Sequence, residues 1–89
     1  MIIQEIHYSK EFLENFKKMP KNIQEKAIEN LEKLKENPFY PSLRLHSLKG
    51  KLEWLWSISL SKAYRVTFEP LENWDILLTS IWTHSIYEK

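Results

Sequence analysis

Hydrophobic residues recur every three or four positions through the first half of the chain, a spacing that predicts two amphipathic helices. The first covers residues 9–19, with Ser9 placed to cap its start, and the second covers residues 21–36, with Pro20 suited to its first turn. Their inward faces consist of Phe12, Phe16, Met19, Ile23, Ala27, Leu31 and Leu34. Lys and Glu fill the other faces, and the prolines of "NPFYP" end the second helix. We therefore expect a helical hairpin.

On both sides of this hairpin the hydrophobic period is two, which is typical of β-strands. A short strand is expected in "IIQEIHY". After the prolines, Leu43 and Leu45 alternate with Arg44 and His46, and Gly50 marks a turn between lysines. The next strands are "WLWSISLS" and "YRVTFE", and the nearly continuous apolar run "WDILLTSIW" predicts a central strand. Short connections make the last strands an antiparallel meander.

The order β-α-α-β-β-β-β predicts a single α+β domain over residues 1–89, with the helices packed on one face of a small twisted sheet. The face toward the helices should carry Trp54, Trp56, Ile58, Tyr64, Val66 and Phe68. The opposite face should collect Arg44, His46, Ser57, Ser59, Arg65 and Thr67. An open polar face is ordinary for such a sheet, whereas an arginine in the middle of a strand is less ordinary.

The amino-acid composition says more about the class of protein than the net charge of +1 does. The absence of cysteine excludes a disulfide framework and thiolate chemistry, and it fits a reducing compartment. We find no signal peptide and no apolar run as long as a membrane span, so a cytoplasmic protein is expected. The charge is segregated, because residues 43–68 carry +4 while residues 69–89 carry −3. A basic segment of this kind suits a local contact with phosphate.

Several chemistries do not fit the sequence. A single glycine leaves no Gly-rich phosphate loop, and a Ser-His-Asp triad is disfavoured because Asp75 is the only aspartate. The three histidines, His7, His46 and His84, lack the spacing of metal ligands, so we expect neither a metal nor a cofactor. The acidic residues lie mostly on helix surfaces and form no visible pocket for glycoside hydrolysis.

The residues that remain are cations, histidines and a tyrosine in and after the basic segment. Cationic side chains bind phosphate, histidine transfers protons at neutral pH, and aromatic rings stack on splayed bases. RNA cleavage without a metal needs a base for the ribose 2′-hydroxyl, an acid for the departing 5′-oxygen, and cations on the phosphate. The candidates are Arg44, His46, Lys49, Lys51, Lys62, Arg65, His84 and Tyr87.

Each candidate also has a purely structural explanation. Arg65 suits an ion pair with Glu53 or Glu69, and His46 suits a backbone hydrogen bond at the end of a strand. The turn lysines are compatible with simple solvation, and the C-terminal histidine and tyrosine with a role in closing the core. We expect His7 to be structural, and the four tryptophans to belong mainly to the core.

Several stretches together resemble the RelE/ParE superfamily of toxins from bacterial type II toxin–antitoxin systems. They are "ENPFYPSLRLHSLKG", "WLWSISLSKAYRVTF" and "LTSIWTHSIY", and the resemblance covers nearly the whole chain. It implies a cytoplasmic mRNA interferase of the RelE/YafQ-like branch, which cuts mRNA in the ribosomal A site and so inhibits translation. It also implies an antitoxin that wraps the toxin, with the complex binding its own operator DNA.

The resemblance implies a role for four of the candidates. His46 in "HSLKG" and His84 in "THSIY" resemble the acid–base histidines of the YafQ-like branch. Arg65 in "YRV" matches the family's phosphate-binding arginine, and Tyr87 resembles the base-stacking tyrosine of RelE-like members. The expected phosphate contacts beyond these are Arg44, Lys49, Lys51 and Lys62.

The sequence departs from the family pattern at several positions. Ser57 and Ser59 stand where the RelE branch has strand lysines, and Trp82 stands where a glycine is usual. A further His and Asp of the YafQ branch have no obvious equivalent. Two alternatives therefore stay open: a ParE-like inhibitor that poisons DNA gyrase by binding, and a catalytically weak relic that only binds an antitoxin.

Overall fold

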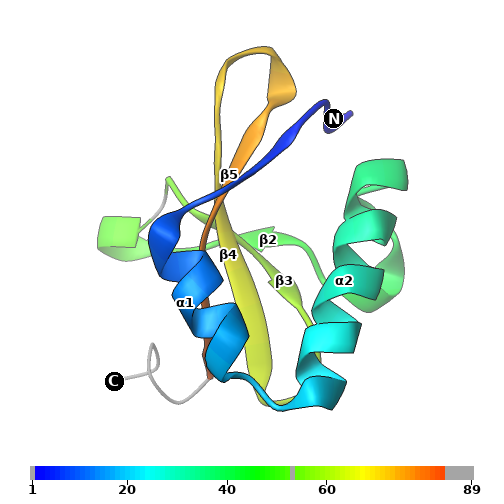
Figure 1. Ribbon diagram of the computed structural model, residues 1–89. Helices are drawn as coiled ribbons and strands as arrows, with labels where there is room; N and C mark the ends of the chain where they lie inside the picture. Colours follow the sequence, from blue (N-terminus) through cyan, green and yellow to red (C-terminus); the bar gives the residue numbers. More distant parts are fainter. Residues whose placement is uncertain (1, 53, 84–89) are drawn as a thin grey trace.

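The order of elements in the computed structural model is the predicted one, and residues 2–52 and 54–83 are described here (Figure 1). The helices and strands are β1 (Ile6–Tyr8), α1 (Lys10–Lys18), α2 (Lys21–Glu36), β2 (His46–Ser47), β3 (Trp56–Ser59), β4 (Tyr64–Pro70) and β5 (Ile76–Thr83). The described residues also contain three short 3-10 segments: η1 (Pro41–Leu43) before β2, η2 (Gly50–Leu52) between β2 and β3, and η3 (Glu72–Trp74) between β4 and β5.

The five strands form one mixed sheet in the order β1-β5-β4-β3-β2. Strands β2 to β5 are the predicted antiparallel meander. The N-terminal strand β1 adds to the far side of β5 in parallel, a pairing that the sequence alone did not reveal. With β1 on one side and β4 on the other, β5 lies inside the sheet, which explains its continuous apolar sequence.

Local capping fixes the start of α1 as the sequence predicts. The Ser9 hydroxyl oxygen accepts the Phe12 backbone N–H at 3.0 Å, and the same hydroxyl donates to the Thr79 carbonyl at 3.1 Å. One side chain therefore caps the helix and ties it to β5. Phe12, 2% exposed, then enters the core between helix and sheet.

The core lies between the two helices and one face of the sheet, as expected from the alternation in β3 and β4. Its fully enclosed members include Ala27, Leu34, Leu43, Ile58, Val66, Phe68, Ile76 and Leu78. The prediction was wrong for Trp54, which is 52% exposed, because β3 begins only at Trp56 and the alternation does not extend back to it. Trp74 is also exposed, at 48%, whereas Trp82 is buried.

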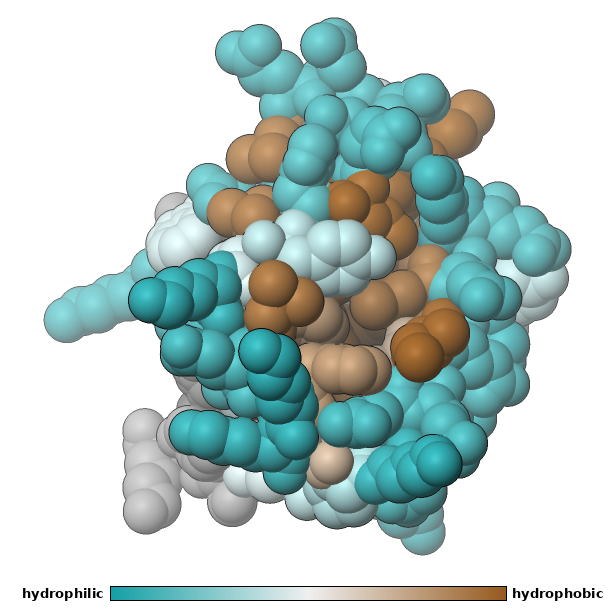
Figure 2. Space-filling view, viewed as in Figure 1, coloured by the Kyte–Doolittle hydropathy of each residue, from teal (hydrophilic) through white to brown (hydrophobic). Residues whose placement is uncertain are grey.

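The helices cover the same face of the sheet but diverge from Pro20 instead of packing as a close pair (Figure 1). An apolar groove of about 450 Å³ lies between them, lined by Tyr8, Leu13, Phe16 and Ile28 among others. Figure 2 shows this apolar surface framed by hydrophilic side chains. The predicted hairpin is therefore open, and part of its inward face stays accessible.

The strand predicted from Leu43 onward is mostly absent. Residues Pro41–Leu43 form η1, and Arg44 takes a left-handed conformation, with φ 50° and ψ 47°. A non-glycine residue in this region breaks an extended strand and carries strain. Pairing with β3 is left to His46 and Ser47 alone.

Candidate functional site

One row of side chains crosses the sheet on the face away from the core. The strand register sets His46 opposite Ser57, Ser57 opposite Thr67, and Thr67 opposite Ser80. Directly opposed residues project from the same face, and the neighbours of Thr67 on β4, Val66 and Phe68, project into the core. The predicted polar face therefore exists, with His46 at its outer edge.

Much of this row is closed to solvent, contrary to the expectation of an open hydroxyl-rich face. Ser57, Thr67 and Ser80 are all buried. The Thr67 hydroxyl lies 2.8 Å from the Ser80 hydroxyl and 2.7 Å from that of Thr79, so these groups satisfy one another. They act as structural groups, whereas His46, Ser59 and Arg65 on this face remain accessible.

His46 is exposed, and its ring has a defined orientation. Its Nδ1 lies 3.0 Å from the carbonyl oxygen of Arg44. Because a carbonyl only accepts hydrogen bonds, Nδ1 carries the proton in this contact, and the neutral ring keeps its lone pair on Nε2. The backbone hydrogen bond expected as a structural explanation thus leaves Nε2 available as a base.

Arg65 is half-buried in β4, opposite Ser59 on one side and Trp82 on the other. Its Nη1 donates to the Ser57 hydroxyl oxygen at 3.4 Å. Within the described residues it forms no ion pair with Glu69, and Glu53 lies outside them. Arg65 therefore retains its charge for a ligand and contacts the row that contains His46.

The other predicted cations fall into two groups. Lys49 and Lys51 are exposed on either side of Gly50, whose φ of 72° suits the turn into η2. Arg44 and Lys62 line a polar pocket of about 290 Å³ together with Arg65. The remaining candidates, His84 and Tyr87, lie outside the residues that the structure describes.

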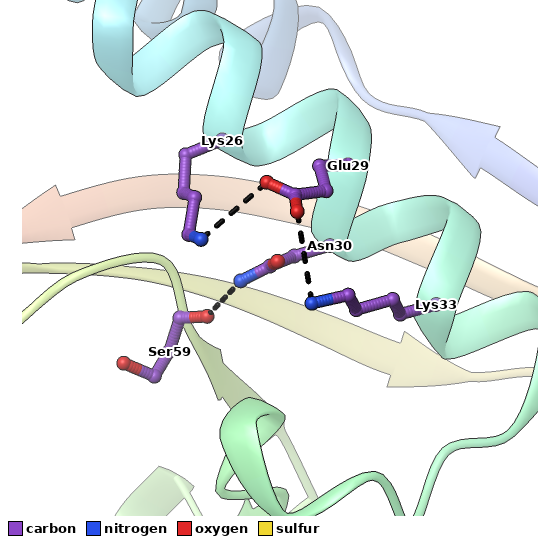
Figure 3. A network of polar contacts seen from close by, with 5 residues as sticks. All are labelled: Lys26, Glu29, Asn30, Lys33 and Ser59. Atoms are coloured by element: carbon purple, nitrogen blue, oxygen red, sulfur yellow. Dashed lines mark hydrogen bonds and ion pairs between the residues drawn. The ribbon is translucent and has the colours of Figure 1, made fainter.

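Two residues of α2, Lys26 and Asn30, also line this pocket, and the sequence analysis did not single them out. Asn30 is 3% exposed, and its Nδ2 donates to the Ser59 carbonyl at 2.7 Å, at the end of β3 (Figure 3). The sequence did contain a signal for Asn30, because it is an asparagine among the apolar positions of the inward helix face. Buried amides of this kind need a specific hydrogen-bond partner.

The residues that the structure describes show few other features of chemical interest. They contain no group of three or more His, Asp or Glu side chains able to hold a metal ion. No helix among them is both long and apolar enough to cross a membrane. A hydrogen bond from the Tyr40 phenol to Glu36, at 2.9 Å, raises the pKa of Tyr40 above its usual value, and the Glu36 charge adds to this effect.

No family model matches this sequence, and no curated protein matches it either. Solved structures do match its fold. YafQ from E. coli is 16% identical, with a TM-score of 0.78 over 97% of this chain and 100% of its own. The YoeB/ParE toxin from Agrobacterium tumefaciens is 14% identical, with a TM-score of 0.76 over 91% of this chain and 99% of its own.

Structures of complexes are among these matches. A chain of the E. coli DinJ–YafQ toxin–antitoxin complex is 16% identical and has a TM-score of 0.77 over 99% of this chain and 100% of its own. At such low identities the likeness concerns the fold, and it extends over more than nine-tenths of the molecule. The chain has the fold of the YafQ and YoeB/ParE toxins.

Proposed function

We propose that this protein is a toxin of a type II toxin–antitoxin system, an endoribonuclease that cleaves mRNA in the ribosomal A site and so inhibits translation. The observation that carries the proposal is the placement of His46 and Arg65 beside Ser57 on one face of a toxin fold. Within residues 2–52 and 54–83, no hydrogen bond engages His46 Nε2 and no carboxylate pairs with Arg65. These are a base and a phosphate-binding cation, the two functions that RNA cleavage by the ribose 2′-hydroxyl requires first.

The chemistry follows from these roles. His46 Nε2 takes the proton of the ribose 2′-hydroxyl, and the 2′-oxygen attacks the adjacent phosphorus. A 2′,3′-cyclic phosphate forms as the bond from phosphorus to the 5′-oxygen breaks. Arg65 stabilises the negative charge that grows on the phosphoryl oxygens, because its guanidinium donates two hydrogen bonds in a fixed geometry.

Two further roles rest on the family resemblance. His84 donates a proton to the departing 5′-oxygen, which balances the proton that His46 removes. Tyr87 stacks on a base and so holds the substrate in place. Lys49 and Lys51, exposed on the hairpin turn beside His46, supply contacts to RNA phosphates.

The partner we propose is an antitoxin that places an apolar helix face in the groove between α1 and α2. Leu13 and Ile28 are 45% and 53% exposed there, although each is a large apolar side chain. Two of the similar solved structures are toxin–antitoxin complexes. A groove between two helices suits a third helix, and its occupation would remove this apolar surface from water. The complex, in this proposal, binds operator DNA in the cytoplasm.

One observation favours a second candidate, a ParE-like inhibitor of DNA gyrase that works by binding alone. Ser57 and Ser59 provide no positive charge on β3, and Ser57 is fully buried. A toxin of this kind would induce DNA damage and leave mRNA intact. The endoribonuclease is preferred because the Arg44 carbonyl orients the His46 ring, and no group in the described part of the chain binds its Nε2.

Primer extension on a defined mRNA in a reconstituted translation reaction tests the proposal. The purified protein is added with and without ribosomes, and new 5′ ends are mapped. The proposal expects cuts that appear only with ribosomes. Intact mRNA under both conditions, together with inhibited gyrase supercoiling, would establish the second candidate instead.

A further inference from the structure

The polar pocket beside Arg65 is a separate feature from the row that contains His46. It lies where the chain leaves β3, between α2, the segment after η1 and the turn that leads into β4. Its volume of about 290 Å³ is at the lower limit of ligand sites, which suits a small group such as a phosphate with part of its sugar.

Among the described residues, four cations and no carboxylate line this pocket: Lys26, Arg44, Lys62 and Arg65. Lys26 has a partner outside the lining, because its Nζ lies 3.4 Å from a carboxylate oxygen of Glu29 (Figure 3). Arg44 and Lys62 form no ion pair with any residue in the described ranges 2–52 and 54–83. Like charges gathered around one hollow repel one another, and a bound anion relieves that repulsion.

Arg44 connects this pocket to His46. Its backbone carbonyl accepts the hydrogen bond from His46 Nδ1, and the same residue lines the pocket. The left-handed conformation of Arg44, at φ 50°, makes both possible by turning the chain out of the strand. Strain at a non-glycine residue persists where the surrounding structure enforces it, and such residues cluster at functional sites.

Neutral groups add to the pocket. The Ser61 hydroxyl oxygen accepts the backbone N–H groups of Ala63 and Tyr64, each at 3.2 Å, so its hydrogen is left to donate to an anion. Asn30 joins α2 to the Ser59 carbonyl and so fixes the far wall. In Figure 3 the Lys26 and Asn30 side chains extend from α2 toward the end of β3.

We propose that this pocket is a second phosphate subsite, which holds a backbone phosphate of the RNA next to the one that is cut. Arg65 belongs to both sites, because it lines the pocket and donates to Ser57 beside His46. The subsite rests on the proposed function for its substrate. Its chemistry, cations and a hydroxyl donor around a small hollow, selects phosphodiester groups without regard to base.

The test is equilibrium binding of a 2′-O-methyl RNA oligonucleotide, which lacks the nucleophile for cleavage, and of DNA of the same sequence. The variant Arg44→Gln/Lys62→Gln removes two pocket charges and keeps the Arg44 carbonyl. The matched control, Lys10→Gln/Lys17→Gln, removes two exposed charges from α1. We expect the pocket variant to bind both oligonucleotides about tenfold more weakly, since charged hydrogen bonds are lost. The slope of the logarithm of its binding constant against the logarithm of salt concentration should be shallower by about 0.7 per lost phosphate contact.

Unchanged affinity and salt slope in the pocket variant, or an equal loss in the control variant, would overturn the subsite. Saturable binding of inorganic phosphate with unchanged oligonucleotide affinity would also overturn it, because the pocket would then serve a free anion. These measurements need neither ribosomes nor cleavage. Failure of the wild-type protein to cut mRNA would therefore contradict the proposed endoribonuclease and leave the binding result in place.

Discussion

The guanidinium of Arg65 donates to the hydroxyl of Ser57 at 3.4 Å, and Ser57 is the residue directly opposite His46 in the sheet. Arg65 and His46 lie on different, non-adjacent strands and are 19 positions apart in the sequence, but they share this buried serine as a neighbour. A serine at this point leaves room for the arginine to reach across β3.

Replacing Arg65 by lysine should lower the rate of mRNA cleavage roughly 100-fold or more, because an ammonium keeps the charge but loses the paired donors of the guanidinium. Arg65 is half-buried in β4, so the thermal unfolding midpoint is measured alongside the rate. A folded Arg65→Lys protein with the wild-type rate would exclude a phosphate-binding role for the guanidinium.

The two serines of β3 should respond oppositely to lysine. Ser57→Lys should destabilise the protein by about 3 kcal/mol or more, because Ser57 is fully buried and an ammonium there would lie beside the like charge of Arg65. Ser59→Lys should fold, because Ser59 is only half-buried. Its affinity for single-stranded RNA should depend more steeply on salt concentration, with a log–log slope steeper by about 0.7. Urea denaturation and oligonucleotide titration measure the two effects. Similar stabilities for both variants would show that the difference in burial has no consequence.

A charged side chain in the groove between α1 and α2 should weaken antitoxin binding without affecting mRNA cleavage. Ile28→Glu places a carboxylate on the apolar surface between the helices, and we expect antitoxin binding at least about 30-fold weaker, as for the loss of an interface hot spot. Cleavage should stay at the wild-type rate, since the groove lies on the helix-covered face. The control is Ile2→Glu, at an apolar residue that is 69% exposed outside the groove. Equal antitoxin affinity for the two variants would place the partner elsewhere.

Ser9→Ala should lower the free energy of unfolding by about 1–2 kcal/mol, because it removes the cap of α1 and the hydrogen bond to Thr79. Ser47→Ala, at an exposed serine of β2, should change it by less than about 0.5 kcal/mol. Chemical denaturation of both variants measures the difference. Equal stabilities would mean that Ser9 does not hold α1 against β5.

The sequence was sufficient to predict the features that depend on local periodicity. The two helices, the Ser9 cap, the meander and the interior position of β5 all follow from the spacing of apolar residues and from short connections. The parallel pairing of β1 with β5 did not follow, because it joins segments about 70 residues apart and leaves no local pattern. The divergence of the helices is likewise a matter of tertiary packing.

The site was predictable in part. His46 and Arg65 share a face because alternation and a short hairpin fix the register. Arg44 was expected on the same strand as His46, but its left-handed conformation takes it into the pocket. The sequence has no glycine at this position that would have indicated the turn. The burial of Ser57 and Thr67 depends on neighbours across the sheet, which a strand pattern cannot show.

The central claim is that His46 acts as the base in RNA cleavage, and the rate of ribosome-dependent mRNA cleavage by His46→Ala tests it most directly. The matched control is His7→Ala, which removes the other histidine within the described residues. His7 lies in β1, and its Nε2 is 3.1 Å from a carboxylate oxygen of Asp75. We predict a loss of roughly 10²- to 10⁴-fold for His46→Ala and a wild-type rate for His7→Ala. Undiminished cleavage by a folded His46→Ala protein would contradict this assignment of the site.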